Sequence, residues 1–170
     1  TAAAAAEAIV GALVDAVETR GRADWATTGG SAPIPIYRAL IQPRLRDTVP
    51  WERVHVWWGD DRYVGRANPL SNVLAFDREF LPSVALPAEN VHAMRMDEAI
   101  GSGAGPGMVA SAYEVDMRAA GLPVDDAEFP RIDVVLVGLG DDGHVLSAFP
   151  GSPLFDEAGW VSPVPALAAV

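Results

Sequence analysis

An unbroken apolar run, Val134–Val137, leads directly into a turn that holds three glycines, two adjacent carboxylates and a histidine. Such a run is typical of a strand covered on both faces, as in a parallel sheet, because a half-exposed strand alternates apolar with polar residues. Glycines in the following turn permit a tight bend and let a ligand come close to the backbone. We therefore expect 131–140 to contain a buried parallel strand and Gly138–His144 to be a candidate site.

The rest of the chain alternates between helical and strand-like patterns. Apolar residues recur at helical spacing in 2–20, and bulky residues occupy both sides of a strand that starts at Arg53. Three further helices are expected: one that starts near Pro33, one that follows an N-cap at Ser71, and one over 108–120. Three further strands are expected: one that starts at Arg22, one within 89–94, and one within 159–164. The glycine-rich segment 101–107 is expected to be a flexible loop. This alternation predicts an α/β fold with a parallel sheet and helices on both faces.

Composition narrows the class of protein. A chain of 170 residues with a net charge of −11, whose twelve basic residues are all arginine, lacks the basic face of a nucleic-acid binder. It has no cysteine, which excludes disulfides and thiol chemistry, and no apolar run of membrane-spanning length. We expect a single domain over 1–170, a monomer, located in the cytoplasm. The acidity still permits an anionic ligand, held by a few arginines and backbone amides.

Three stretches rich in chemical groups follow expected strands, and parallel strands bring their carboxyl ends to one edge of a sheet. In the first, Gly29 and Gly30 expose backbone amides and Ser31 adds a hydroxyl, which suits a phosphate; a plain turn is the alternative. In the second, Arg62 could grip a phosphate, and Asp60 could bind sugar hydroxyls or orient a water; a solvated loop with a local ion pair is the alternative.

The third stretch carries His144, the natural general base near neutral pH, with Asp142 placed to orient it and with Gly140 and Gly143 shaping the turn. An ordinary glycine-rich turn is the alternative. No metal is expected, because His55 and His92 lack ligand spacing to His144. No cofactor is expected either, since 101–107 lacks the lysine of a nucleotide-binding loop. The absence of a Gly-x-Ser-x-Gly motif argues against a serine hydrolase.

Four ordered blocks, "TTGGSAPIPIYRAL", "WERVHVWWGDDRYV", "SNVLAF" and "RIDVVLVGLGDDGHVLSAFPGSPL", together resemble the 6-phosphogluconolactonase family. The resemblance implies a three-layer α/β/α sandwich with a Rossmann-like sheet, truncated here at both ends relative to the family. It also implies metal-free hydrolysis of a sugar phosphate lactone, 6-phospho-D-glucono-1,5-lactone, in the oxidative pentose phosphate pathway. His144 matches the family's base; Gly29, Gly30 and Ser31 match its phosphate loop; and Arg62, Ser71 and Asn72 match residues near the substrate.

Two alternatives to a lactonase stay open. Glucosamine-6-phosphate deaminases share the Asp-Gly-His motif, but the resemblance places Phe149 where their catalytic glutamate would stand, and phenylalanine has no acid–base chemistry. A non-catalytic sugar-phosphate sensor is the other alternative. Val145 replaces a threonine that is usual in the lactonases, and Asp60-Asp61 replaces a commoner Asp-Glu pair, so turnover could differ from that of the family.

Overall fold

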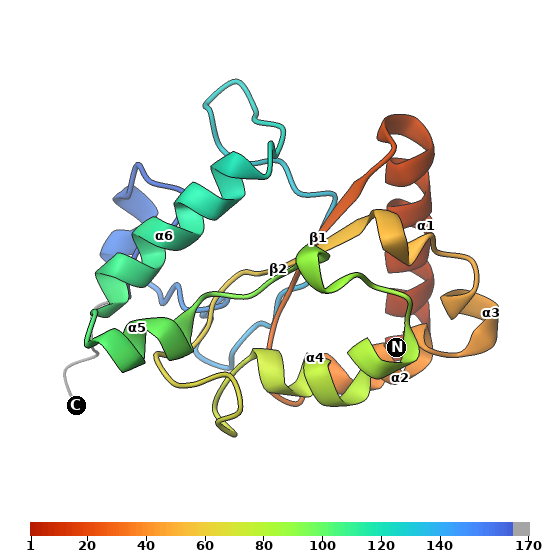
Figure 1. Ribbon diagram of the computed structural model, residues 1–170, viewed down its shortest axis with the longest axis horizontal. Helices are drawn as coiled ribbons and strands as arrows, with labels where there is room; N and C mark the ends of the chain where they lie inside the picture. The colour runs from red at the N-terminus through yellow and green to blue at the C-terminus, as the bar shows by residue number, and fades with distance from the viewer. Residues whose placement is uncertain (165–170) are drawn as a thin grey trace.

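The computed structural model describes residues 1–164, in which helices surround one sheet (Figure 1). The strands are β1 (Ala23–Thr27), β2 (Val54–Trp58), β3 (Val91–His92) and β4 (Val134–Val135); the helices are α1 (Ala2–Arg20), α2 (Ile34–Leu40), α3 (Pro43–Arg46), α4 (Val73–Glu79), α5 (Met96–Ser102) and α6 (Pro106–Ala119). The expected single domain extends to Val170, so its last part, residues 165–170, lies outside the described residues.

All strand pairs in the sheet are parallel, and the strand order is β3-β2-β1-β4. Trp25 of β1 lies in register with Val56 of β2 on one side and with Val134 of β4 on the other. Every residue of β1 is buried, which is the behaviour expected of a central strand in a parallel sheet. The expected α/β fold with a parallel sheet is confirmed.

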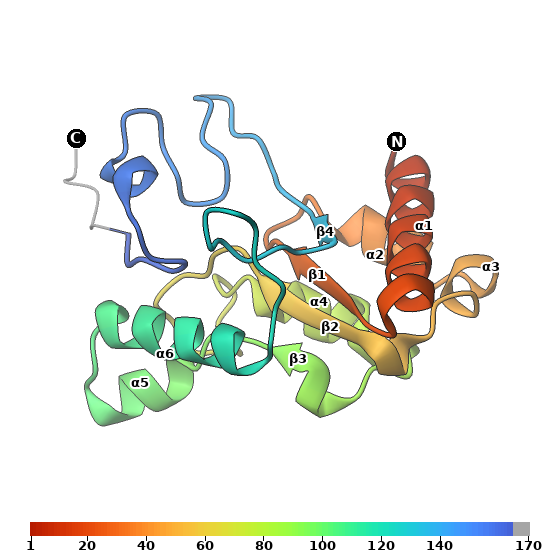
Figure 2. The same cartoon turned by 90° about the horizontal axis from the view of Figure 1, so that it is seen from above.

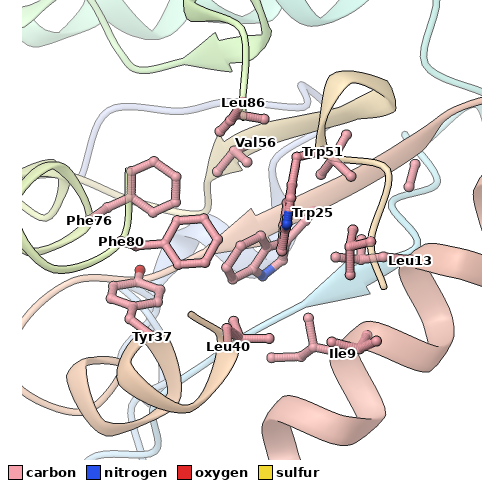
Figure 3. Packing of buried hydrophobic residues seen from close by; sticks show 14 of the residues in the cluster. Ile9, Leu13, Trp25, Tyr37, Leu40, Trp51, Val56, Phe76, Phe80 and Leu86 are labelled. Carbon is pink, nitrogen blue, oxygen red and sulfur yellow. The ribbon is translucent and has the colours of Figure 1, made fainter. Parts of the chain in front are cut away.

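One face of the sheet packs against α1, α2 and α4 through a dense aromatic cluster (Figure 3). Trp25 makes edge-to-face contacts with Tyr37, Phe76 and Phe80 at ring-centroid distances of 6.2, 6.2 and 5.6 Å. Such contacts add to the stabilisation that burial alone provides. This face is the main core of the molecule.

The other face packs against α6, and Figure 1 shows α5 and α6 on the side of the sheet away from α1. Alternation along the strands turns Ala26 and Trp57 toward this side, where they meet Tyr113 and Met117 of α6. Helices therefore cover both faces, and the three-layer α/β/α arrangement is confirmed. Among residues 1–164, no helix combines the length and apolarity needed to cross a bilayer.

The expectation of a fully buried strand over Val134–Val137 is wrong. Ladder pairing is limited to Val134 and Val135, and Val135 and Val137 are 53% and 45% exposed. The reason is position: β4 lies at the edge of the sheet formed by the described residues, and the cluster beneath α6 centres on Ala26 and Trp57. The apolar pattern correctly predicted a strand here, but the burial of a strand depends on which other segments pack on its faces.

Three smaller expectations also fail. Segment 101–107 is mostly helical, because α5 continues to Ser102 and α6 starts at Pro106, leaving a tight connection in which Gly103 has φ of 74°. Residues 159–164 form no strand. The N-cap of α4 is Asn72 rather than Ser71, although the Ser71 hydroxyl still accepts a hydrogen bond from the Val73 amide at 3.2 Å.

Candidate active site

The turns after β1, β2 and β4 meet around one cavity of about 180 Å³ at the carboxyl edge of the sheet. Among the predicted site residues, those that line it are Gly29, Asp60, Arg62, Asn72, Gly140 and His144. Its other lining residues are Thr28, Gly138, Leu139 and Leu146; Gly138 and Leu139 belong to the candidate stretch Gly138–His144, whereas Leu146 lies beyond it. The expectation that three separate stretches come together at one sheet edge is confirmed.

His144 is paired with Asp142, as expected. Its Nδ1 lies 2.5 Å from Oδ1 of Asp142, and the same oxygen accepts a hydrogen bond from the His144 amide at 3.2 Å. The hydrogen bond from the imidazole holds the pKa of the Asp142 carboxyl below its ordinary value. A carboxylate at Nδ1 favours the tautomer with its proton there, which leaves Nε2 as the proton acceptor. The carboxylate of Asp142 thus fixes the orientation of the imidazole.

The two glycines beside His144 act through conformation. A Cβ on Gly140 would lie 2.2 Å from Cε1 of His144, so any side chain there would displace the imidazole. Gly143 has φ of 87°, in the left-handed region that glycine tolerates. Their amides already donate to the carbonyl oxygens of His144 and Gly140, both at 2.9 Å. These glycines shape the turn, and their amides are committed within it.

Asp60 sits opposite this turn and is held on both carboxylate oxygens. Nδ2 of Asn72 donates to Oδ1 at 2.9 Å and to the Asp60 carbonyl at 2.8 Å, while the Ser147 hydroxyl donates to Oδ2 at 2.5 Å. Ser147 was not among the predicted site residues. It carries no motif or periodic signal of its own, and only the position of its loop beside β2 places it here.

Asp61 is turned away from the cavity and organises the chain after β2. Its Oδ1 accepts hydrogen bonds from the amides of Asn72 and Arg62 at 2.7 and 2.8 Å, and its Oδ2 accepts one from the Ser71 hydroxyl at 3.2 Å. Burial raises the pKa of this carboxyl, and the hydrogen bonds from Asn72 and Arg62 oppose that rise. Ser71 therefore contacts Asp61 and does not line the cavity.

Arg62 supplies a cation at the cavity wall. Its Nη1 donates to the Leu70 carbonyl at 2.9 Å, which positions the guanidinium while other N–H groups remain to face an anion. Within residues 1–164 it forms no ion pair, so the alternative of a local ion pair with the neighbouring carboxylates is not what the structure shows.

The turn after β1 is only partly in the cavity wall. Gly29 packs directly on Asn72, since a Cβ there would lie 2.0 Å from Oδ1 of that side chain. Gly30, with φ of 74°, and Ser31 are exposed and lie outside the lining. Asn72 is 2% exposed, and its Oδ1 is buried without a hydrogen-bond partner in the described structure. Asn72 is therefore the side chain that joins the β1 and β2 turns.

The remaining histidines form a separate pair on the α6 side of the sheet. Nδ1 of His55 lies 2.9 Å from Nε2 of His92, and Trp57 stacks on His92 at a centroid distance of 3.9 Å. Burial lowers the pKa of His55, and it lowers that of His92 to about 4. No group of three or more potential metal ligands gathers anywhere in residues 1–164.

Comparison with known proteins gives consistent matches. The family model described as glucosamine-6-phosphate isomerases/6-phosphogluconolactonase matches residues 1–168. A 6-phosphogluconolactonase of Synechocystis is 38% identical over 83% of this chain and 55% of its own length. The chain thus spans about half the length of that curated relative.

Solved structures agree. The 6-phosphogluconolactonase of Trypanosoma brucei matches 99% of this chain and 68% of its own with a TM-score of 0.77 at 27% identity. A monomeric glucosamine-6-phosphate deaminase matches 89% of this chain and 58% of its own with a TM-score of 0.63 at 15% identity, which shows a shared fold alone. With the family model covering nearly the whole sequence, the chain belongs to the family of glucosamine-6-phosphate isomerases and 6-phosphogluconolactonases.

Proposed function

We propose that the protein hydrolyses 6-phospho-D-glucono-1,5-lactone to 6-phospho-D-gluconate, with His144 as general base. The observation that carries the proposal is the Asp142–His144 pair, with 2.5 Å between Oδ1 and Nδ1, at the wall of a cavity that also holds Asp60 and Arg62. Curated relatives that carry the lactonase name support the choice of substrate. In this role the enzyme acts in the oxidative pentose phosphate pathway.

The proposed step uses water and protein groups alone. Nε2 of His144 takes a proton from water as the oxygen attacks C1 of the lactone, and the carbonyl becomes a tetrahedral oxyanion. The carbonyl then re-forms as the bond between C1 and the ring oxygen breaks, and the imidazolium returns its proton to that oxygen. Asp142 stabilises the imidazolium while it exists, so the charge pair is stronger in the transition state than before it.

In this proposal Arg62, Asp60 and the loop after β1 bind the sugar phosphate. Arg62, with its unused N–H groups, pairs with the phosphate, and Gly29, Gly30 and Ser31 form the neighbouring loop. Each Asp60 oxygen has one protein donor and a further lone pair, so it can still accept a hydrogen bond from a sugar hydroxyl. Ser71 and Asn72 support this wall from behind. A monomeric state and a cytoplasmic location stay predictions.

A deaminase is the second candidate, since a solved deaminase shares the fold. Phe149 argues against it. Its ring packs on His144 with centroids 4.8 Å apart, so the position assigned to the deaminase glutamate holds an apolar side chain that transfers no proton. Release of ammonia from glucosamine 6-phosphate would support this candidate. Tight binding of 6-phosphogluconate without turnover of the lactone would support a sensor instead.

The test is His144→Ala, made in the protein at its full natural length. Loss of a general base should lower the lactonase rate by about 10²-fold or more. Phosphogluconate formation is measured with the spontaneous hydrolysis of the lactone subtracted. His55→Gln, which changes a histidine outside the cavity lining, is the control and should keep the rate within about twofold. An unchanged rate in His144→Ala would refute the proposal.

A further inference from the structure

The segment just after His144 forms a tight turn whose tip points at the end of β2. Val145 and Ala148 exchange backbone hydrogen bonds of 3.1 and 2.9 Å, which leaves Leu146 and Ser147 at the tip. Leu146 has φ of 53°, a left-handed conformation that is unfavourable for a leucine and persists where surrounding contacts hold it. The strained residue indicates that the tip is held in place from outside.

Two contacts hold the tip, and they fall on successive residues after β2. The Leu146 side chain covers Gly59 so closely that a Cβ there would lie 2.6 Å from Cδ1 of the leucine. The Ser147 hydroxyl donates to Oδ2 of Asp60 at 2.5 Å. A short hydrogen bond to a carboxylate is among the stronger kinds in proteins.

Asp60 is a firm anchor for this contact. Its carbonyl and its Oδ1 both accept from Nδ2 of Asn72, a side chain that is 2% exposed at the start of α4. Because both neighbours of Nδ2 are acceptors, the orientation of the Asn72 amide is unambiguous. The tip therefore docks on a corner that the core of the molecule supports.

The contact matters because the loop has few others. Within residues 1–164, the Ser147–Asp60 bond is the one hydrogen bond that joins the segment 138–157 to any residue outside it. The bonds of His144 itself, through its backbone and through Asp142, all stay within the segment. The placement of the base relative to the rest of the cavity then depends on the docked tip.

We propose that Ser147 is a positioning residue. Its hydrogen bond to Asp60, here called the latch, holds the loop that carries His144 and so fixes the distance between the base and the substrate-binding wall. Leu146 assists by packing on Gly59. The kinetic consequence rests on the proposed lactonase function, whereas the latch itself does not. Since a displacement of about 1 Å in an active site costs up to about 10²-fold in rate, the hydroxyl should matter although it touches no reacting atom.

The experiment compares Ser147→Ala and Ser147→Thr with Ser111→Ala, a matched change on the exposed side of α6. The first readout is hydrogen exchange of the amides of 143–149, followed by mass spectrometry without substrate. Removing the hydroxyl should speed exchange there by about tenfold or more, leave β1 and β2 unchanged, and be reversed by threonine. The second readout is kinetics: kcat should fall about 10-fold to 100-fold in the alanine variant, with KM within about twofold.

The outcomes separate the two proposals. Unchanged exchange in Ser147→Ala would overturn the latch, even if activity fell, because Ser147 would then act by touching the ligand. Faster exchange in a protein whose wild type hydrolyses no lactone would sustain the latch and refute the proposed function. If the alanine variant does not fold, Ser147→Cys keeps the volume with a weaker donor, and its exchange must lie above that of the threonine variant.

Discussion

The two ends of the chain meet the same sheet in very different ways. The face under α1, α2 and α4 is closed by interlocking rings, and Trp25, Phe76 and Phe80 are fully buried there. The chain after β4 runs mostly as loops (Figure 2), with Val137, Leu139 and Phe155 45%, 76% and 68% exposed. The candidate catalytic base lies in the loops after β4, whereas the aromatic core is expected to supply most of the stability. Removing groups from each region should therefore affect different properties.

The largest effect is expected in the aromatic core. Phe80→Ala removes a buried ring that contacts Trp25, Tyr37, Trp51 and Phe76, and should lower the free energy of unfolding by about 3–5 kcal/mol. Phe155→Ala, the same change at a ring that is 68% exposed, should cost less than about 0.5 kcal/mol. Urea denaturation checks both values. Equal losses would contradict the division into a stabilising and a weakly packed region.

A smaller effect on stability, with a clear effect on activity, is expected at the turn before His144. A Cβ on Gly140 collides with the imidazole, so Gly140→Ala should displace His144 and lower kcat by about 10-fold to 100-fold. Gly107→Ala, in α6 and outside the cavity lining, is the matched control, because nothing lies within 4 Å of a Cβ there. Steady-state kinetics measure the change in kcat of each variant, and a thermal melt measures the change in its stability. A wild-type rate in Gly140→Ala would show that the imidazole is free to move.

The smallest effect concerns pH and the His55–His92 pair. Burial keeps the pKa of His92 at about 4 in the folded state, below the ordinary 6.5, so the unfolded chain binds more protons between these values. Stability should therefore rise with pH across that window and fall on acidification from 6.5 toward 4. Burial also lowers the pKa of His55, so this histidine contributes a pH dependence of the same sign. The negative charges of Asp24 and Asp116 act in the opposite direction, because they raise the pKa of His92.

The measurement is the urea midpoint of the wild type and of His92→Gln at about pH 5 and about pH 7, a range in which ordinary carboxylates stay ionised. The difference between the two proteins removes the contribution of the raised Asp61 pKa. The midpoint of the variant should change less with pH than that of the wild type. A steeper change in the variant would mean that the histidine pair is stabilised when charged.

The contrast between the regions also explains what could be predicted from sequence. The strand from Arg53 and the helix over 2–20 have strong local patterns, and the shared edge of parallel strands then places Asp60, Arg62 and His144 together. The exposure of Val135 and the partner of Ser147 depend on residues far along the chain. The periodicity of neighbouring residues does not show which distant segments contact a side chain, so neither the exposure of Val135 nor the partner of Ser147 was predicted.

The contact between Phe149 and His144 has a practical consequence for spectroscopy. The chain contains three histidines, and two of them stack with each other while the third lies against a phenylalanine ring at 4.8 Å. A nearby aromatic ring current shifts the proton resonances of an imidazole, and the tilted ring of Phe149 acts on His144 from a different geometry than the stacked rings around His55 and His92. The protein thus carries an intrinsic reporter of the protonation state of the residue proposed to do the chemistry.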